Sequence, residues 1–186
     1  MSTKFEVVKS KVVAKSQLLA TIRTWKSDNQ KIVFTNGVFD LLHRGHIEYL
    51  AQTADFGDKL IVAVNADASV KRLGKGDSRP LQDETSRALI IAAMEFVDAV
   101  IVFDADTPLE MITEIKPDVL IISLWRSQVV GIFVKLFRPR TKLIFFIHSE
   151  ADVHFVDFLS SRVALFLSVE VWADSITSLN QRFNYS

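Results

Sequence analysis

Apolar residues recur along this chain with two different periods. Four short apolar runs predict buried strands, at residues 31–34, 59–64, 99–103 and 118–122. Apolar residues at helical spacing predict helices over residues 16–26, 44–56, 83–96 and 109–115. An alternation of strands and helices is typical of a parallel sheet covered by helices. The pattern predicts an α/β fold, a Rossmann-like three-layer α/β/α sandwich with a mostly parallel sheet.

Local residue choices predict how several of these helices begin and end. Gly57 is placed to be the C-terminal cap of the second helix. Asp83 suits the positive end of the third helix, and Arg87 in its first turns can either pair with Asp83 or project toward a ligand. Thr107 is expected to cap the fourth helix, with Pro108 at its first position.

Residues 123–186 continue the α/β alternation. Strands are predicted at 142–147 and 162–167, and helices at 127–137, at 152–159 and after residue 172. We expect a core with its leading helix over residues 1–122. A divergent α/β continuation over residues 123–186 is expected to pack on the same sheet.

The composition limits the classes of function. The chain has 186 residues, enough for one substantial domain. Its 22 basic and 22 acidic side chains give zero net charge, so nothing at the level of the whole chain indicates nucleic-acid binding. It contains no cysteine, which excludes disulfides and thiolate metal sites and fits a reducing compartment.

Two segments bear on targeting and membrane insertion. Residues 1–15 lack the continuous apolar core of a secretory signal. Residues 119–137 are nearly long enough to span a bilayer, but Arg126, Gln128 and Lys135 would place polar groups in hydrocarbon. We therefore expect a cytoplasmic protein without a membrane partner.

The stretch from Thr35 to His46, TNGVFDLLHRGH, concentrates the candidate chemistry. It lies between a predicted strand and a predicted helix, on the side of a parallel sheet where ligands bind. A helix N-terminus attracts anions, and His43 and His46, at positions i and i+3, can face one phosphate. Gly37 and Gly45 leave room for a tight turn and a close ligand.

Two other interpretations of the histidines are open. A lone histidine at a helix start is often a cap or a solvated side chain. A His-x-x-His pair can also bind zinc, but the chain offers no cysteine and no obvious acidic third ligand nearby. Two histidines that flank a glycine directly after a strand favour the phosphate site.

Residues 65–80 change abruptly from apolar to basic and are expected to form a loop on the ligand side of the sheet. Lys71, Lys75 and Arg79 are candidates to neutralise phosphate charge, because charge-assisted donors make strong contacts to polyphosphates. The alternative is an exposed basic loop that is only solvated.

The stretch from Thr35 to His46 resembles the HxGH signature of the cytidylyltransferase-like nucleotidyltransferases. The similarity continues through residues 64–73, 78–81, 84–88, 104–109 and 116–120. Within that family the chain is most similar to the D-glycero-β-D-manno-heptose 1-phosphate adenylyltransferases of lipopolysaccharide core synthesis. Glycerol-3-phosphate cytidylyltransferases come next.

The resemblance implies transfer of AMP from ATP to a sugar 1-phosphate, here a heptose 1-phosphate, with release of pyrophosphate. It implies that His43, His46 and Lys71 are catalytic, with the histidines stabilising phosphate charge in the transition state. The residues implied in nucleotide and phosphate binding are Thr35, Asn36, Gly37, Phe39, Asp40, Gly45, Asn65, Asp67, Lys75, Arg79 and Arg87. Mg²⁺ is expected to arrive with ATP, and no side chain is assigned as a metal ligand.

The resemblance ends near residue 122. Family members continue with a Lys-Gly-Gly-Asp-type turn and finish with a Ser-Thr-Thr-type segment, whereas this chain has SLWRSQ at 123–128 and DSITS at 174–178. Residues 124–127 and 145–149 instead resemble part of the N-terminal lobe of two-lobed glycosyltransferases, which suggests a fused reading frame.

Two further functions stay open beside the adenylyltransferase. One is a CTP-dependent cytidylyltransferase of the glycerol 3-phosphate type. The other is a nucleotide-binding protein made inactive by the atypical last third of the chain. The expected partners are a nucleoside triphosphate and a sugar phosphate, with no nucleic acid, and a homodimer is one of the open oligomeric states.

Overall fold

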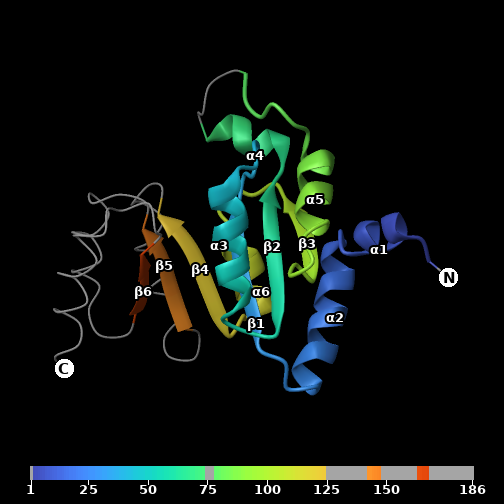
Figure 1. Cartoon of the computed structure of the whole chain (residues 1–186), viewed down its shortest axis with the longest axis vertical. Helices are drawn as coiled ribbons and strands as arrows, with labels where there is room; N and C mark the ends of the chain where they lie inside the picture. Colours follow the sequence, from blue (N-terminus) through green and yellow to red (C-terminus); the bar gives the residue numbers. More distant parts are fainter. Residues whose placement is uncertain (1, 74–77, 125–141, 148–162, 168–186) are drawn as a thin grey trace. The chain divides into compact units, whose positions relative to one another are not determined.

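The computed structural model describes residues 2–73, 78–124, 142–147 and 163–167. The chain divides into two compact units, residues 1–120 and residues 121–186. Every residue of the predicted site belongs to the first unit, which is drawn in blue to yellow in Figure 1.

Helices and strands alternate through the first unit. Its helices are α1 (Lys4–Ser10), α2 (Lys15–Ser27), α3 (Arg44–Ala54), α4 (Asp67–Arg72), α5 (Glu84–Ala92) and α6 (Leu109–Ile115). Its strands are β1 (Ile32–Gly37), β2 (Lys59–Asn65) and β3 (Ala99–Phe103), and β4 (Val119–Leu124) begins at the end of the unit.

The strands lie side by side in the order β3-β2-β1-β4. β1 pairs with β2 in parallel from Ile32↔Lys59 to Gly37↔Val64, and β2 pairs in parallel with β3. The start of β4 is attached to β1 because Ile32 N–H donates to the Asp118 carboxylate, 2.8 Å away. The carboxyl ends of β1, β2 and β3 therefore meet at one edge of the sheet, as the apolar runs predicted.

Helices cover both faces of this sheet. Crossovers between parallel strands are right-handed, so α3 and α5, which follow β1 and β2, share one face, and α6 lies on the other. Lys15 of α2 forms ion pairs with Glu110 and Glu114 of α6, which places α2 beside α6. Figure 1 shows α3 in front of the sheet and α6 behind it. The predicted three-layer α/β/α fold is confirmed.

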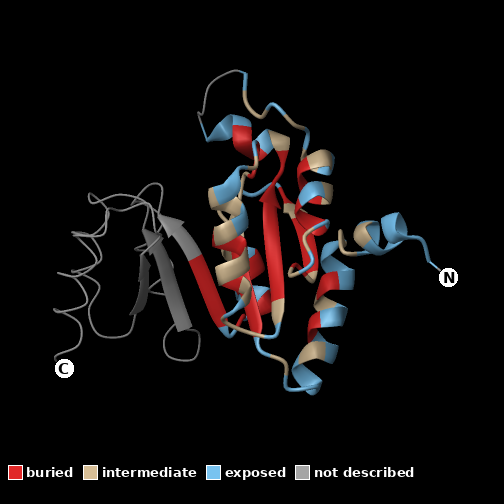
Figure 2. Ribbon diagram, in the orientation of Figure 1, coloured by how far each residue is buried: buried red, intermediate tan, exposed pale blue. Residues whose placement is uncertain are grey.

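The core of the unit is the sheet itself. Residues 32–35 of β1 and 60–65 of β2 are buried, and the helices beside the sheet combine buried and exposed residues (Figure 2). The strands contain mainly valine, isoleucine and phenylalanine, which suit a strand that is covered on both faces. Such a rigid sheet holds the loops at its carboxyl edge in fixed positions.

The structure corrects three predictions about where elements begin and end. Residues 65–80 are not a continuous loop, because 67–72 form α4, whose Ser69 and Val70 are buried. Gly57 is not the cap of α3; Asp55 is, and Gly57 instead packs where a Cβ would lie 2.7 Å from the Lys31 carbonyl oxygen. The N-cap of α6 is Pro108 rather than the preceding threonine.

Two elements differ in extent from the prediction. β1 continues past residue 34 to Gly37, so the first part of the histidine stretch is strand rather than turn. α5 ends at Ala92, short of residue 96. Besides α4, α1 was not predicted. It begins with a capping box between Thr3 and Glu6, a short-range pattern that needs no apolar periodicity.

The second unit contains two described strands, β5 (Lys142–Ile147) and β6 (Val163–Leu167). They pair in parallel from Leu143↔Val163 to Ile147↔Leu167, which confirms both predicted strands. The helices predicted at 127–137, at 152–159 and after 172 lie outside the described residues. No helix in the part of the chain that the structure describes has the length and apolar character needed to cross a membrane.

Candidate functional site

The site begins at the carboxyl end of β1, where Gly37 allows the chain to turn under an aromatic ring. A Cβ at Gly37 would lie 2.8 Å from the Phe39 ring, closer than side chains tolerate. Phe39 has a left-handed backbone with φ 51° and is buried, so its ring cannot move away freely. Phe39 was predicted to contact nucleotide; in the structure its ring packs against Gly37.

His43 and His46 lie side by side at the start of α3. His43 is the N-cap, and its Nδ1 accepts a hydrogen bond from Gly45 N–H at 3.2 Å. The two imidazole centroids are 4.1 Å apart, and the His46 ring meets the Phe39 ring edge-on at 5.7 Å. The cap interpretation and the paired-ligand interpretation are therefore compatible, because His43 caps the helix while its ring stays beside His46.

A buried hydroxyl contact fastens α3 to β1 beneath the histidines. Thr35 on β1 is fully buried, and its hydroxyl bonds to the hydroxyl of Tyr49, which is 7% exposed. Burial raises the pKa of Tyr49, so the phenol stays protonated. Thr35 was predicted to bind nucleotide, and in the structure its side chain serves this contact between β1 and α3.

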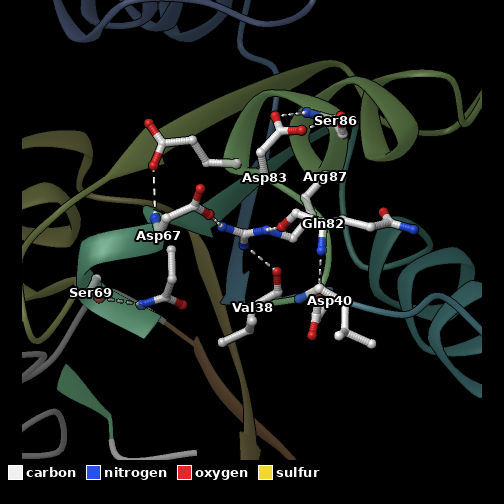
Figure 3. A network of polar contacts seen from close by, with 11 residues as sticks. Val38, Asp40, Asp67, Ser69, Gln82, Asp83, Ser86 and Arg87 are labelled. Carbon is white, nitrogen blue, oxygen red and sulfur yellow. Dashed lines mark hydrogen bonds and ion pairs between the residues drawn. The ribbon is translucent and has the colours of Figure 1, made fainter. Parts of the chain in front are cut away.

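Arg87 is the centre of the polar network drawn in Figure 3. It is fully buried, and its guanidinium donates to the Val38 carbonyl at 2.6 Å, to Asp67 at 2.6 Å and to the Gln82 carbonyl at 2.9 Å. Arg87 thus joins the histidine turn, the start of α4 and the turn before α5. The proposed pairing with Asp83 does not occur, since that carboxylate caps α5 through Ser86.

Asp40 anchors the turn before α5 to the histidine stretch. Its carboxylate accepts N–H bonds from Leu81 at 2.8 Å and Gln82 at 3.0 Å, and Arg79 pairs with it at 2.6 Å. Burial acts to raise the pKa of Asp40, but the hydrogen bonds from Gln82, Arg79 and Leu81 outweigh it and hold the pKa below its ordinary value. Asp40 and Arg79 were predicted to contact phosphate, and here they form a mutual ion pair.

The start of α4 is also occupied by protein groups. Asp67 N–H donates to the Glu84 carboxylate at 2.7 Å, so a side chain fills the place that an anion would take at this helix end. Asn65 donates to Ser69, and Ser69 in turn donates to the Ala105 carbonyl. These contacts leave the N-terminus of α3 as the better candidate for binding phosphate.

The basic residues of the predicted site divide into two groups. Lys71, in the last turn of α4, is exposed at the carboxyl edge of the sheet, and the neighbouring Arg72 pairs with Asp104 at 3.1 Å and Asp106 at 2.6 Å. Lys75 lies outside the described residues. Lys71 is therefore exposed to solvent, whereas Arg79 and Arg87 pair with carboxylates of the protein.

The described acidic residues near the site do not form a metal-binding cluster. Among the described residues, no group of three or more histidine, aspartate or glutamate side chains is arranged to hold a metal ion. Asp40 and Asp67 are engaged by Arg79 and Arg87 respectively. A divalent cation here would have to be held largely by the phosphate oxygens of a substrate.

Some groups that hold the candidate site together could not have been predicted from the local sequence. The carbonyls of Val38 and Gln82 act through the backbone, and Glu84 reaches a residue 17 positions away. Tyr49 carries a weak signal, because a polar tip on the buried face of a predicted helix requires a partner. The predicted turn, the α3 N-terminus and Lys71 are brought to one edge of the sheet, as the sequence indicated.

A parallel sheet with a glycine turn and paired imidazoles at a helix N-terminus, all at the carboxyl edge, defines an α/β protein with a candidate anion site at that edge. Residues 34–129 match the family model described as Cytidylyltransferase-like, and the chain belongs to the cytidylyltransferase-like family. The family resemblance is thereby confirmed.

Similar proteins include two named "Bifunctional protein HldE". The one from Koribacter versatilis is 51% identical over 115 residues, which cover 62% of this chain and 24% of that protein. The one from Campylobacter jejuni subsp. jejuni serotype O:6 is 50% identical over 129 residues, covering 65% of this chain and 27% of that protein. The chain thus spans about a quarter of the length of these curated relatives.

One solved structure adds support for the fold alone. Pantoate-beta-alanine ligase from Francisella tularensis, complexed with beta-gamma ATP and beta-alanine, aligns with a TM-score of 0.54 at 16% identity. The alignment covers 90% of this chain and 85% of the ligase.

Proposed function

We propose that this chain transfers AMP from ATP to a heptose 1-phosphate and releases pyrophosphate. The observation that carries the proposal is the pair of imidazoles, 4.1 Å apart, at the N-terminus of α3. The resemblance to heptose 1-phosphate adenylyltransferases and the identity of about 50% to the HldE proteins favour ATP and this acceptor.

The chemistry needs charge stabilisation more than acid or base catalysis. A phosphate oxygen of the sugar 1-phosphate forms a bond to the α-phosphorus of ATP, and the bond from that phosphorus to the bridging oxygen breaks. The electron pair leaves with pyrophosphate, so no covalent enzyme intermediate is required. In this proposal His43, His46 and Lys71 donate to the phosphate oxygens as negative charge shifts toward the leaving group.

The remaining predicted residues are assigned to binding and support. Asn36, Gly37 and Gly45 lie along the turn that would face the phosphates, and Asn65 and Asp67 lie at the next strand end. Mg²⁺ is proposed to enter with ATP, whose charge it partly neutralises. The protein would supply few of its ligands, because the nearby carboxylates already accept bonds from protein donors.

We propose that the reaction takes place in the cytoplasm. ATP and sugar phosphates are cytoplasmic metabolites, and the lack of cysteine fits that compartment. Residues 123–186 are proposed to continue the α/β fold on the same sheet. A homodimer is the oligomeric state we would test first.

A cytidylyltransferase that uses CTP and glycerol 3-phosphate is the second candidate, because the chain also resembles the glycerol-3-phosphate cytidylyltransferases of the same family. The two candidates share every step at the phosphates and differ in the base and the acceptor.

Pyrophosphate release tests these functions directly. The purified chain is incubated with ATP or CTP, each with heptose 1-phosphate or glycerol 3-phosphate, and phosphate is measured after added pyrophosphatase. Turnover with ATP and heptose 1-phosphate above the other three combinations is expected. Higher turnover with CTP and glycerol 3-phosphate would favour the second candidate. Nucleotide binding by calorimetry without any turnover would favour an inactive binding protein.

A further inference from the structure

Beneath the histidine turn, two hydroxyl groups meet in the protein interior. Thr35 is fully buried on β1, and Tyr49 on α3 is 7% exposed. Their oxygens are hydrogen-bonded to each other. A hydrogen bond is directional, so this contact between β1 and α3 favours one position of Tyr49 relative to β1.

Tyr49 follows His46 by three positions on α3, which places both side chains on neighbouring parts of the same helix face. A rotation of α3 about its axis would therefore move both residues together. The rings that touch His46 are those of His43 and Phe39, at 4.1 Å and 5.7 Å between centroids. Ring contacts of this kind tolerate sliding, whereas a hydrogen bond is directional.

We propose that Tyr49 is a positioning residue for the transfer reaction. Its hydroxyl, fixed by Thr35, sets the rotation of α3 on the sheet and so the place of the His46 imidazole beside His43. The inference rests on the proposed function. It also reassigns the side chain of Thr35 from nucleotide contact to support of the catalytic helix.

The expected kinetic effect follows from the proposed role of His46, which is to stabilise phosphate charge in the transition state. If the imidazole stabilises charge mainly in the transition state, its displacement lowers kcat and leaves the KM for ATP nearly unchanged. Displacements of about 1 Å in an active site cost up to about 100-fold in rate. Loss of one buried hydrogen bond should move α3 by less than about 1 Å. A decrease in kcat of about 10-fold is therefore expected.

The test uses the full chain with Tyr49→Phe, Thr35→Val and the double variant. Each single variant is expected to lower kcat about 10-fold, and the double variant no further than the worse single variant, because both remove the same contact. Thr35→Ser, which keeps a hydroxyl, is expected to retain more activity than Thr35→Val. Additive losses in the double variant would overturn the proposal.

A matched control separates positioning from stability. Ile112→Val deletes one methyl group from the buried face of α6, on the other side of the sheet, and should lower the melting temperature to a similar extent. It is expected to leave kcat unchanged. An equal loss of kcat in Ile112→Val would mean that Tyr49 acts only through stability.

A second measurement is independent of activity. The imidazole resonances of the chain are recorded by NMR, and His46 is identified with a His46→Asn variant. Tyr49→Phe should shift the His46 signals, and Ile112→Val should not. Unchanged His46 signals in Tyr49→Phe would refute positioning even if kcat falls. If the wild-type chain shows no turnover, the proposed function fails, and the NMR shift alone decides whether Tyr49 positions His46.

Discussion

Arg87 is fully buried, and its guanidinium connects three separate segments of the chain. Each of its three guanidinium nitrogens donates to an acceptor on a different segment: Val38, Asp67 and Gln82. A lysine has a single nitrogen and could not reach all three in this geometry. The residue therefore determines how the three segments at the carboxyl edge of the sheet are arranged, whatever ligand they bind.

Replacement of Arg87 by methionine should strongly destabilise the fold. The variant leaves the part-buried carbonyls of Val38 and Gln82 without this donor and Asp67 without its partner. We expect a loss of about 3 kcal/mol in the free energy of unfolding. Urea unfolding followed by circular dichroism measures it. Arg23→Met, at an exposed position on α2, is the control and should change stability by less than about 0.5 kcal/mol. Similar losses in both variants would contradict the connector role.

Gly37 should tolerate no side chain, because a Cβ would meet the Phe39 ring at 2.8 Å. Gly37→Ala is expected to cost about 1–3 kcal/mol through overpacking, and to lower kcat because Phe39 contacts His46. Gly57→Ala provides a matched control, since its Cβ would lie 2.7 Å from the Lys31 carbonyl at the amino end of the strands. It should lower stability with kcat retained. A normal kcat in Gly37→Ala would show that Phe39 does not support His46.

At the scale of elements, the turn that joins Arg79 to α5 depends on one carboxylate. Asp40 accepts bonds from Arg79, Leu81 and Gln82, and its pKa in the folded state lies below its ordinary value. The unfolded chain therefore takes up a proton at higher pH than the folded chain does. The stabilisation is complete above the unfolded pKa of about 4 and is lost as the pH falls toward the folded value.

Asp40→Asn should remove that dependence on pH. We expect the wild-type free energy of unfolding to fall between about pH 5 and pH 2, and the variant to fall less steeply from a lower starting value. Chemical denaturation at a series of pH values is the measurement, with Asp28→Asn at the exposed end of α2 as the control. Parallel pH curves for the wild type and Asp40→Asn would show that another carboxylate is responsible.

The sequence predicts the bounds of a helix or strand well where the burial of apolar residues alone determines them. β2 and β3 are apolar runs covered on both faces, and their bounds were found within a residue. α4 was missed because it has six residues, too few for a helical period, and is held by distant partners such as Glu84 and Ala105. The same holds for the site: the turn residues are contiguous, but the partners of Arg87 and Asp40 come together only when the sheet forms.

At the scale of the molecule, the site belongs to one unit. The predicted nucleotide and phosphate residues lie between Thr35 and Arg87, inside residues 1–120. The sheet that supports them is buried by helices of the same unit. Residues 123–186 depart from the family in sequence, so their contribution to nucleotide binding has to be measured separately from the contribution of the histidine turn.

A chain that ends after residue 124 is expected to bind ATP almost as well as the full chain. Because the implicated side chains and β1, β2 and β3 are all retained, we expect affinities within about threefold, less than about 1 kcal/mol, by titration calorimetry. Circular dichroism and cooperative unfolding establish first that the shorter chain is folded. A folded chain without ATP binding would place part of the nucleotide site in residues 125–186. A chain that fails to fold would show that residues 125–186 are needed for the stability of the first unit.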